Sequence, residues 1–73
     1  MELLDLFMIG KEGFAVGDLG VVLHTVDGGE KWKMENSGVS QQLNGIFLAS
    51  PDRGWIVGRG GLILKYVLPA LPE

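Results

Sequence analysis

Short apolar runs alternate with glycine-bearing polar turns along most of the chain. The runs are rich in β-branched and aromatic residues, and turn residues interrupt them about every eight to twelve positions, which is typical of all-β proteins. No long stretch has the 3.6-residue period of an amphipathic helix. The pattern predicts an all-β fold with strands over residues 2–9, 14–16, 21–26, 31–35 and 43–49, followed by two more within 54–64.

The glycines repeat at a constant spacing. Gly13, Gly17 and Gly20 each have a glycine counterpart 41 residues further along the chain. A repeat of about 40–45 residues that holds four strands is typical of a β-propeller blade. Two prolines near the end of the chain disfavour another inner strand after the second repeat. The sequence therefore predicts one complete four-stranded antiparallel blade over residues 1–42, three strands of a second blade over 43–66, and a proline-containing tail over 67–73.

The strongest local signal is the stretch Thr-Val-Asp-Gly-Gly-Glu-Lys-Trp at residues 25–32. An Asp-Gly pair between two apolar runs predicts a β-hairpin turn. Asp27 is expected to fold its carboxylate onto N–H groups of the turn, while Gly28 and Gly29 supply positive φ angles. Trp32 is expected to cover the turn where the next strand begins. We therefore expect Asp27 to be a structural carboxylate, and not a general acid or a metal ligand.

The small size of the chain predicts that it has neighbours. A domain of 73 residues hides only about 60% of its unfolded surface, and without cysteine no disulfide or thiolate-bound metal adds stability. Two blades side by side would also leave two flat apolar sheet faces open. We therefore expect either self-association into a ring, where three or four copies give six or eight blades, or further blades in a longer propeller.

Charge and the amino terminus exclude several classes of partner. The net charge is −3 and the six Lys and Arg residues are scattered, so we expect no binding to nucleic acid or to anionic membranes. Acidic residues stand where a signal peptide needs cations, and no apolar run has the length of a membrane span. As written, the chain is expected to be cytoplasmic and not inserted in a membrane.

Two other features suggest chemistry but have simpler interpretations. His24 is the single histidine, and its counterpart in the second repeat is Lys65, which favours a solvated strand-edge residue over a ligand or a base. Residues 58–61, Gly-Arg-Gly-Gly, resemble a phosphate-binding loop. Their counterpart at 17–20 carries an acid and neither segment opens a helix, so a hairpin turn is the better interpretation.

The remaining candidates are surface or core residues. Arg53 and Arg59 are the two arginines, and they are either a partner-binding surface or simply solvated. Four aromatic residues are expected in the core between blades, with a carbohydrate platform as the alternative for one of the tryptophans: Phe14, Trp32, Phe47 and Trp55.

The string Thr-x-Asp-x-Gly-x-x-Trp, at Thr25, Asp27, Gly29 and Trp32, resembles the Asp-box, also called the bacterial neuraminidase repeat. The wider unit, from the glycine at 13 to the tryptophan at 32, and its echo over 54–64 are similar to the repeat of photosystem II stability and assembly factors. The resemblance extends to about residue 66. In place of the threonine that usually precedes the Asp-box tryptophan, this chain has Lys31.

The resemblance implies a non-catalytic β-propeller module that acts as a protein-binding scaffold, without a cofactor or metal. Its partner would be a protein, and the family suggests an assembly intermediate of a membrane protein. The alternative is a fragment of an Asp-box glycoside hydrolase of the sialidase type, which requires an arginine cluster and a Tyr/Glu pair. Two arginines and one tyrosine do not provide that site in one copy, so we expect no enzyme activity from this chain alone. A bare structural repeat is a third possibility.

Overall fold

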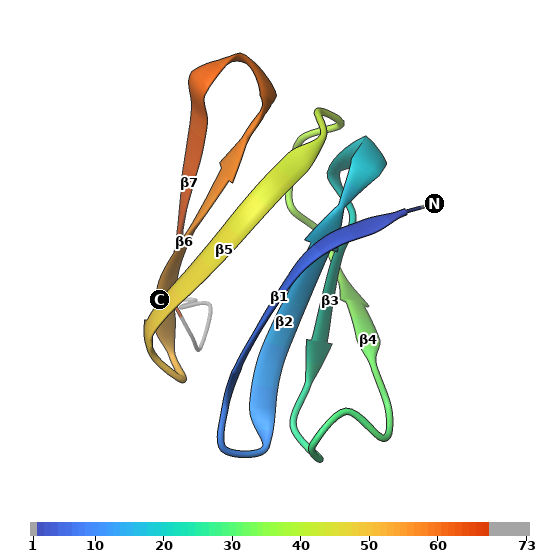
Figure 1. Cartoon of the computed structure of the whole chain (residues 1–73), viewed down its shortest axis with the longest axis vertical. Helices are drawn as coiled ribbons and strands as arrows, with labels where there is room; N and C mark the ends of the chain where they lie inside the picture. Colours follow the sequence, from blue (N-terminus) through green and yellow to red (C-terminus); the bar gives the residue numbers. More distant parts are fainter. Residues whose placement is uncertain (1, 68–73) are drawn as a thin grey trace.

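Two antiparallel β-sheets pack face to face in the computed structural model, which describes residues 2–67 (Figure 1). In each sheet the strands lie side by side in chain order. This arrangement confirms the expected all-β fold, with one four-stranded blade and three strands of a second. The first sheet contains β1 (Leu3–Ile9), β2 (Glu12–Gly17), β3 (Val22–Thr25) and β4 (Lys33–Glu35), and the second contains β5 (Leu43–Ser50), β6 (Arg53–Gly58) and β7 (Leu62–Val67).

The expected start of β4 is wrong. This strand begins at Lys33, two residues later than expected, because Lys31 and Trp32 both donate hydrogen bonds into the preceding turn. The other strands match their apolar runs to within about three residues at either end. The expected tail included residue 67, which the structure places at the end of β7, and the rest of the tail lies outside the described residues.

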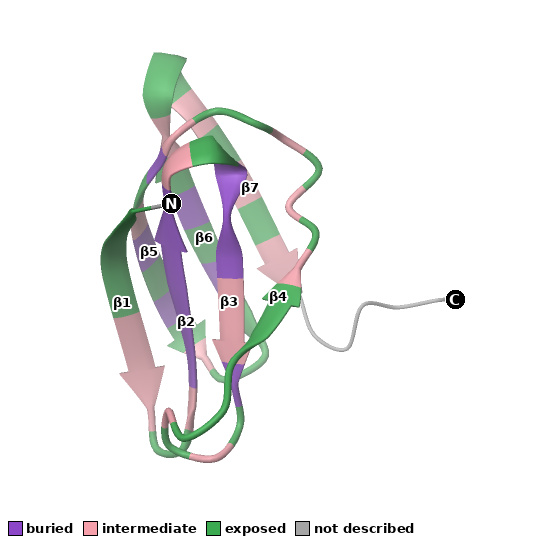
Figure 2. Cartoon of the chain, turned by 90° about the vertical axis from the view of Figure 1, so that its right-hand side faces the viewer, coloured by how far each residue is buried: buried purple, intermediate pink, exposed green. Residues whose placement is uncertain are grey.

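The core lies between the two sheets. Because side chains alternate along a strand, Phe14 and Val16 of β2 enter the core, while Ala15 between them lines the opposite face. Figure 2 shows buried residues along β2 and buried residues alternating with exposed ones on β5 and β6. The buried residues that form this core are Phe14, Val16, Val22, Leu43, Ile46, Leu48 and Ile56.

Only one of the four aromatic residues expected in the core is buried there. Phe14 is fully buried, whereas Trp32 and Trp55 are each 37% exposed and Phe47 is 56% exposed. The two sheets enclose one layer of side chains, and these three residues lie outside it. Their partial exposure is the first sign that the outer faces are apolar.

The two sheets repeat each other in their hydrogen bonds as well as in sequence. Asp18 N donates to Glu2 O at 2.9 Å in the first unit, and Arg59 N donates to Gln42 O at 2.9 Å in the second. A 3₁₀ turn follows each of these bonds, at Asp18–Gly20 and Arg59–Gly61. The glycine-rich segment at 58–61 therefore connects two strands, as expected for a hairpin. Neither helical turn within residues 2–67 has the length or apolar character to cross a membrane.

Candidate functional site

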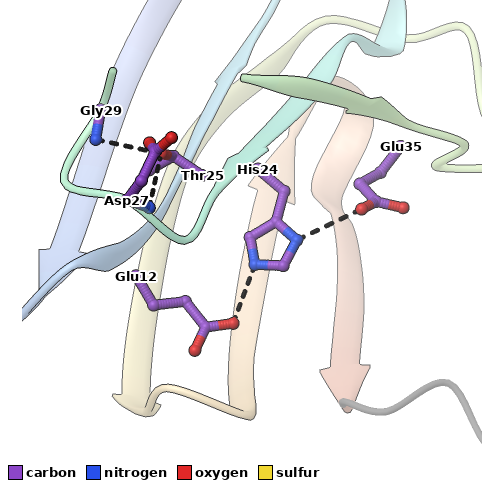
Figure 3. Close-up of polar contacts among 6 residues, drawn as sticks. All are labelled: Glu12, His24, Thr25, Asp27, Gly29 and Glu35. Atoms are coloured by element: carbon purple, nitrogen blue, oxygen red, sulfur yellow. Dashed lines mark hydrogen bonds and ion pairs between the residues drawn. The ribbon is translucent and has the colours of Figure 1, made fainter. Parts of the chain in front are cut away.

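The turn between β3 and β4 is built around the hydroxyl of Thr25, whose side chain is buried. Thr25 Oγ1 donates to Asp27 Oδ1 at 2.9 Å and accepts from Gly29 N at 3.0 Å (Figure 3). Asp27 Oδ1 also accepts from Lys31 N at 2.9 Å. One hydroxyl and one carboxylate oxygen thus close a loop that no strand pairing holds.

Two glycines and a tryptophan complete this turn. Gly28 and Gly29 have φ angles of +78° and +93°, a region that other residues rarely adopt. The indole Nε1 of Trp32 donates to Gly29 O at 3.0 Å, and a Cβ at Gly29 would lie 3.5 Å from the indole ring. Gly28 N donates to Lys11 O at 2.9 Å, which joins the turn to the β1–β2 hairpin. The structure thus brings together all five residues that the sequence singled out around Asp27.

The Asp27 carboxylate is held in its ionised form. The backbone N–H of Lys31 and then the hydroxyl of Thr25 keep the pKa of Asp27 below its ordinary value. A carboxylate that is ionised and committed to two donors has no proton to give, so the geometry suits a structural acceptor better than a general acid.

The structure also shows a polar cluster that the sequence analysis missed. His24 Nε2 lies 2.8 Å from Glu12 Oε2, and His24 Nδ1 lies 3.2 Å from Glu35 Oε2 (Figure 3). The imidazole stacks on Phe14 with a centroid distance of 4.3 Å, and its side chain is 11% exposed. The expectation of a solvated strand-edge residue is therefore wrong. Comparison with Lys65 was misleading because His24 faces the second sheet, whereas Lys65 is exposed.

This cluster links neighbouring strands, and both nitrogens of its imidazole are engaged in contacts within the chain. When both ring nitrogens are protonated, His24 donates to Glu12 on β2 and to Glu35 at the end of β4, and thereby links β2, β3 and β4. Tyr66 of β7 packs edge-on against Phe14 at 4.5 Å. Burial, followed by the charges of Glu35 and Glu12, raises the pKa of Tyr66, so its hydroxyl stays protonated. Within residues 2–67, no group of His, Asp and Glu side chains is arranged to hold a metal ion.

The two arginines do not form one site. Both are exposed, and they lie at opposite ends of β6, with Arg53 at its first residue and Arg59 just after its last. At about 3.3 Å per residue, their Cα atoms are roughly 20 Å apart. Each could contact a partner, but they cannot bind the same carboxylate.

A second carboxylate contact joins the two sheets. Asp5 Oδ2 on β1 accepts a hydrogen bond from Ile46 N on β5 at 2.9 Å. β1 and β5 are edge strands of their sheets, and the contact lies beside a register shift in each strand. The sequence offered no signal for this pairing, because the two residues are 41 positions apart and on different sheets.

Both outer sheet faces are hollowed and are lined largely by apolar side chains. The outer face of the first sheet forms a shallow apolar groove of about 570 Å³, whose outward side chains are Leu4, Leu6, Ala15, Leu23 and Trp32. The outer face of the second sheet has a hollow of about 280 Å³ over Gly45. Phe47, Trp55 and Val57 line this hollow together with Asp5 of β1, and Ile63 lies beside Val57 on the next strand.

Comparison with known proteins identifies the family. The family described as "Photosynthesis system II assembly factor YCF48" matches residues 1–67. A photosystem II assembly protein Ycf48 from Synechococcus sp. is 36% identical over 56 residues, which is 74% of this chain and 17% of that protein. A photosystem II assembly lipoprotein Ycf48 from Synechocystis sp. is 33% identical over 67 residues, 88% of this chain and 20% of that protein.

A plant protein is similar as well. The chloroplastic photosystem II stability/assembly factor HCF136 of Oryza sativa is 29% identical over 58 residues, which is 77% of this chain and 14% of that protein. The chain thus spans a fifth or less of the curated relatives it matches. No solved structure gives a significant match. Since the match covers both units up to residue 67, the chain belongs to the Ycf48 family of photosystem II assembly factors, whose Asp-box repeats build β-propellers.

Proposed function

We propose that this chain is a non-catalytic scaffold of propeller blades that binds proteins during the assembly of photosystem II. The family is shown by the comparisons, and the relatives are named as assembly factors. The chain spans a fifth or less of the length of those relatives, so a role in photosystem II assembly is a proposal for this chain.

The observation that best supports a scaffold is the contrast between engaged polar groups and open apolar faces. The carboxylates of Asp5, Asp27 and Glu12 are all used in contacts within the chain. Large side chains on the outer faces remain exposed, including Leu6 at 54% and Phe47 at 56%. Such faces favour binding over chemistry, because contiguous apolar surface marks sites of protein association.

Several finer features belong to the same proposal. We propose that the units over residues 1–42 and 43–66 are consecutive blades and that the Asp-box turn is structural. Self-association or further blades would cover the outer sheet faces. Arg53 and Arg59 are exposed and roughly 20 Å apart, so they would provide two separate contacts with a partner.

The glycoside hydrolase alternative is not favoured. The matching relatives are assembly factors, and the separation of Arg53 from Arg59 does not allow the arginine cluster that a sialidase needs for its substrate carboxylate. Tyr66 pairs with Gly54, the residue after Arg53, but its ring packs against Phe14 inside the sheet interface. Because neighbouring side chains on a strand point to opposite faces, Tyr66 and Arg53 lie on opposite sides of the sheet.

Partner capture tests the proposal directly. The purified chain is immobilised, detergent-solubilised membranes of a Synechocystis strain are passed over it, and retained subunits of photosystem II and photosystem I are quantified. We expect retention of photosystem II subunits in excess over photosystem I. The double variant Arg53→Glu, Arg59→Glu should retain less than the control Lys11→Glu, Lys33→Glu, which makes the same charge change on other exposed residues. Equal retention of both photosystems, or of neither, would contradict the proposal.

A further inference from the structure

We propose that the two outer faces bind each other between copies of this chain, front to back. The outer face of the first sheet of one copy docks on the outer face of the second sheet of the next. This inference rests on the self-association included in the proposed function, and it specifies which surface meets which.

The interface already present inside the chain supplies the template. Phe14, Val16 and Val22 form the side of the first sheet that is buried against the second. The residues 41 positions later are Trp55, Val57 and Ile63, and strand pairing places them at the matching points of the second sheet. These three are 37%, 45% and 67% exposed. The second sheet therefore exposes a surface equivalent to the one that the first sheet buries.

The complementary surface is repeated as well. Ile46 and Ile56 of the second sheet are buried against the first, and Leu64 packs against the same cluster. In the first sheet, Ala15 and Leu23 stand 41 positions before Ile56 and Leu64. Leu6 lies opposite Ala15 as Ile46 lies opposite Ile56, so strand pairing makes Leu6 the counterpart of Ile46, at a spacing of 40. All three counterparts line the apolar groove. Each copy thus carries both halves of a blade-to-blade contact on its two free faces.

Side chains that differ between the two repeats are larger on one free face and smaller on the other. Trp55 and Ile63 are larger than their counterparts Phe14 and Val22, while Ala15 is smaller than its counterpart Ile56. A contact between copies would therefore join the larger aromatic face to the shallower groove, which is how packed interfaces keep their density.

At position 45, the contact between copies would differ from the contact inside the chain. Gly45 occupies the place in the second sheet that Asp5 has in the first, and the hollow of about 280 Å³ lies over it. The protruding Leu6 of the next copy would fill this hollow. The hydrogen bond from Ile46 N to Asp5 has no equivalent there, so the contact between copies depends on apolar packing.

A front-to-back contact has a defined consequence for symmetry. Because the two surfaces differ, the interface is heterologous, and repeating it gives a ring when the rotation closes. Three or four copies would supply six or eight blades, within the usual range of about 4–8 for propellers.

Two variants, each with one face blocked, test this arrangement. Leu6→Glu places a charge in the outer face of the first sheet, and Val57→Glu does so in the outer face of the second. Leu19→Glu is the matched control, since Leu19 is 74% exposed and lies on neither face. Mass is measured by light scattering, and circular dichroism checks that each variant keeps its β-sheet signal. If a Glu variant loses that signal, Leu6→Gln and Val57→Thr replace it.

We expect each blocked variant alone to have the mass of one chain, 7.9 kDa. Their equimolar mixture should show a twofold increase, because the free second-sheet face of one meets the free first-sheet face of the other, and the control should assemble like the unchanged chain. Dimers of Val57→Glu alone, or no complex in the mixture, would overturn the inference. A chain that stays monomeric yet retains photosystem II subunits would overturn this inference only, whereas an assembled chain that retains none would overturn only the proposed function.

Discussion

Replacing Thr25 with valine isolates the hydroxyl that organises the Asp-box turn. The methyl of valine takes the place of the hydroxyl at almost equal volume, so the change removes polar contacts and leaves the shape of the side chain. Thr25 is 1% exposed, and its Oγ1 donates a hydrogen bond to Asp27 Oδ1 at 2.9 Å and accepts one from Gly29 N at 3.0 Å. At about 1 kcal/mol for each hydrogen bond, the loss should be about 2 kcal/mol.

Thermal unfolding followed by circular dichroism measures this effect. For a domain of this size, 1 kcal/mol corresponds to a shift of roughly 4–8 °C, so Thr25→Val should unfold about 10 °C below the unchanged chain. The second unit supplies the control, because Ser50 Oγ donates to Asp52 Oδ1 at 2.6 Å with the same spacing in sequence but in an exposed turn. Ser50→Ala should therefore have a much smaller effect. Equal shifts for the two variants, or no shift for Thr25→Val, would refute the central role given to the Thr25 hydroxyl.

Three further predictions concern charge, backbone strain and the contact between blades. Because the pKa of Asp27 is lowered in the folded chain, its stabilisation is present above the unfolded value of 3.8 and is lost as the pH falls below it, so Asp27→Asn should lower the unfolding temperature at pH 7 and match the unchanged chain near pH 2. Leu19 has a φ of +57° where the second unit has Gly60 at +76°, so Gly60→Leu should destabilise the chain by about 1 kcal/mol in urea unfolding and Leu19→Gly should not destabilise it. Asp5→Ala removes the acceptor for Ile46 N and should lower the free energy of unfolding by about 1–2 kcal/mol, and an unchanged urea midpoint would contradict the assigned bond.

Features held by local contacts were the most predictable from sequence. The turn around Asp27 was predictable because its side-chain partners all lie within residues 25–32, and the blade topology was predictable because tight turns force neighbouring strands to pair. The apolar outer faces could also be expected, because two blades cannot cover all four sheet surfaces.

Features that depend on the packing of one sheet against the other were not predictable. The contact of His24 with Glu12 and Glu35 requires the register of three strands and the knowledge that this face is covered. Pairing residues 22–24 with residues 33–35 in a hairpin places His24 near Glu35. This was the one signal in the sequence that could have indicated their contact. The bond from Ile46 to Asp5 depends on the relative placement of the two sheets, which no local pattern encodes.

The mass of the unchanged chain in solution tests the central claim most directly, namely that these two sheets are propeller blades whose outer faces pack on further blades. Light scattering over a concentration series, up to tens of micromolar, should show a species of three or four times 7.9 kDa that dissociates on dilution. A single species of 7.9 kDa at every concentration would contradict the claim for this chain.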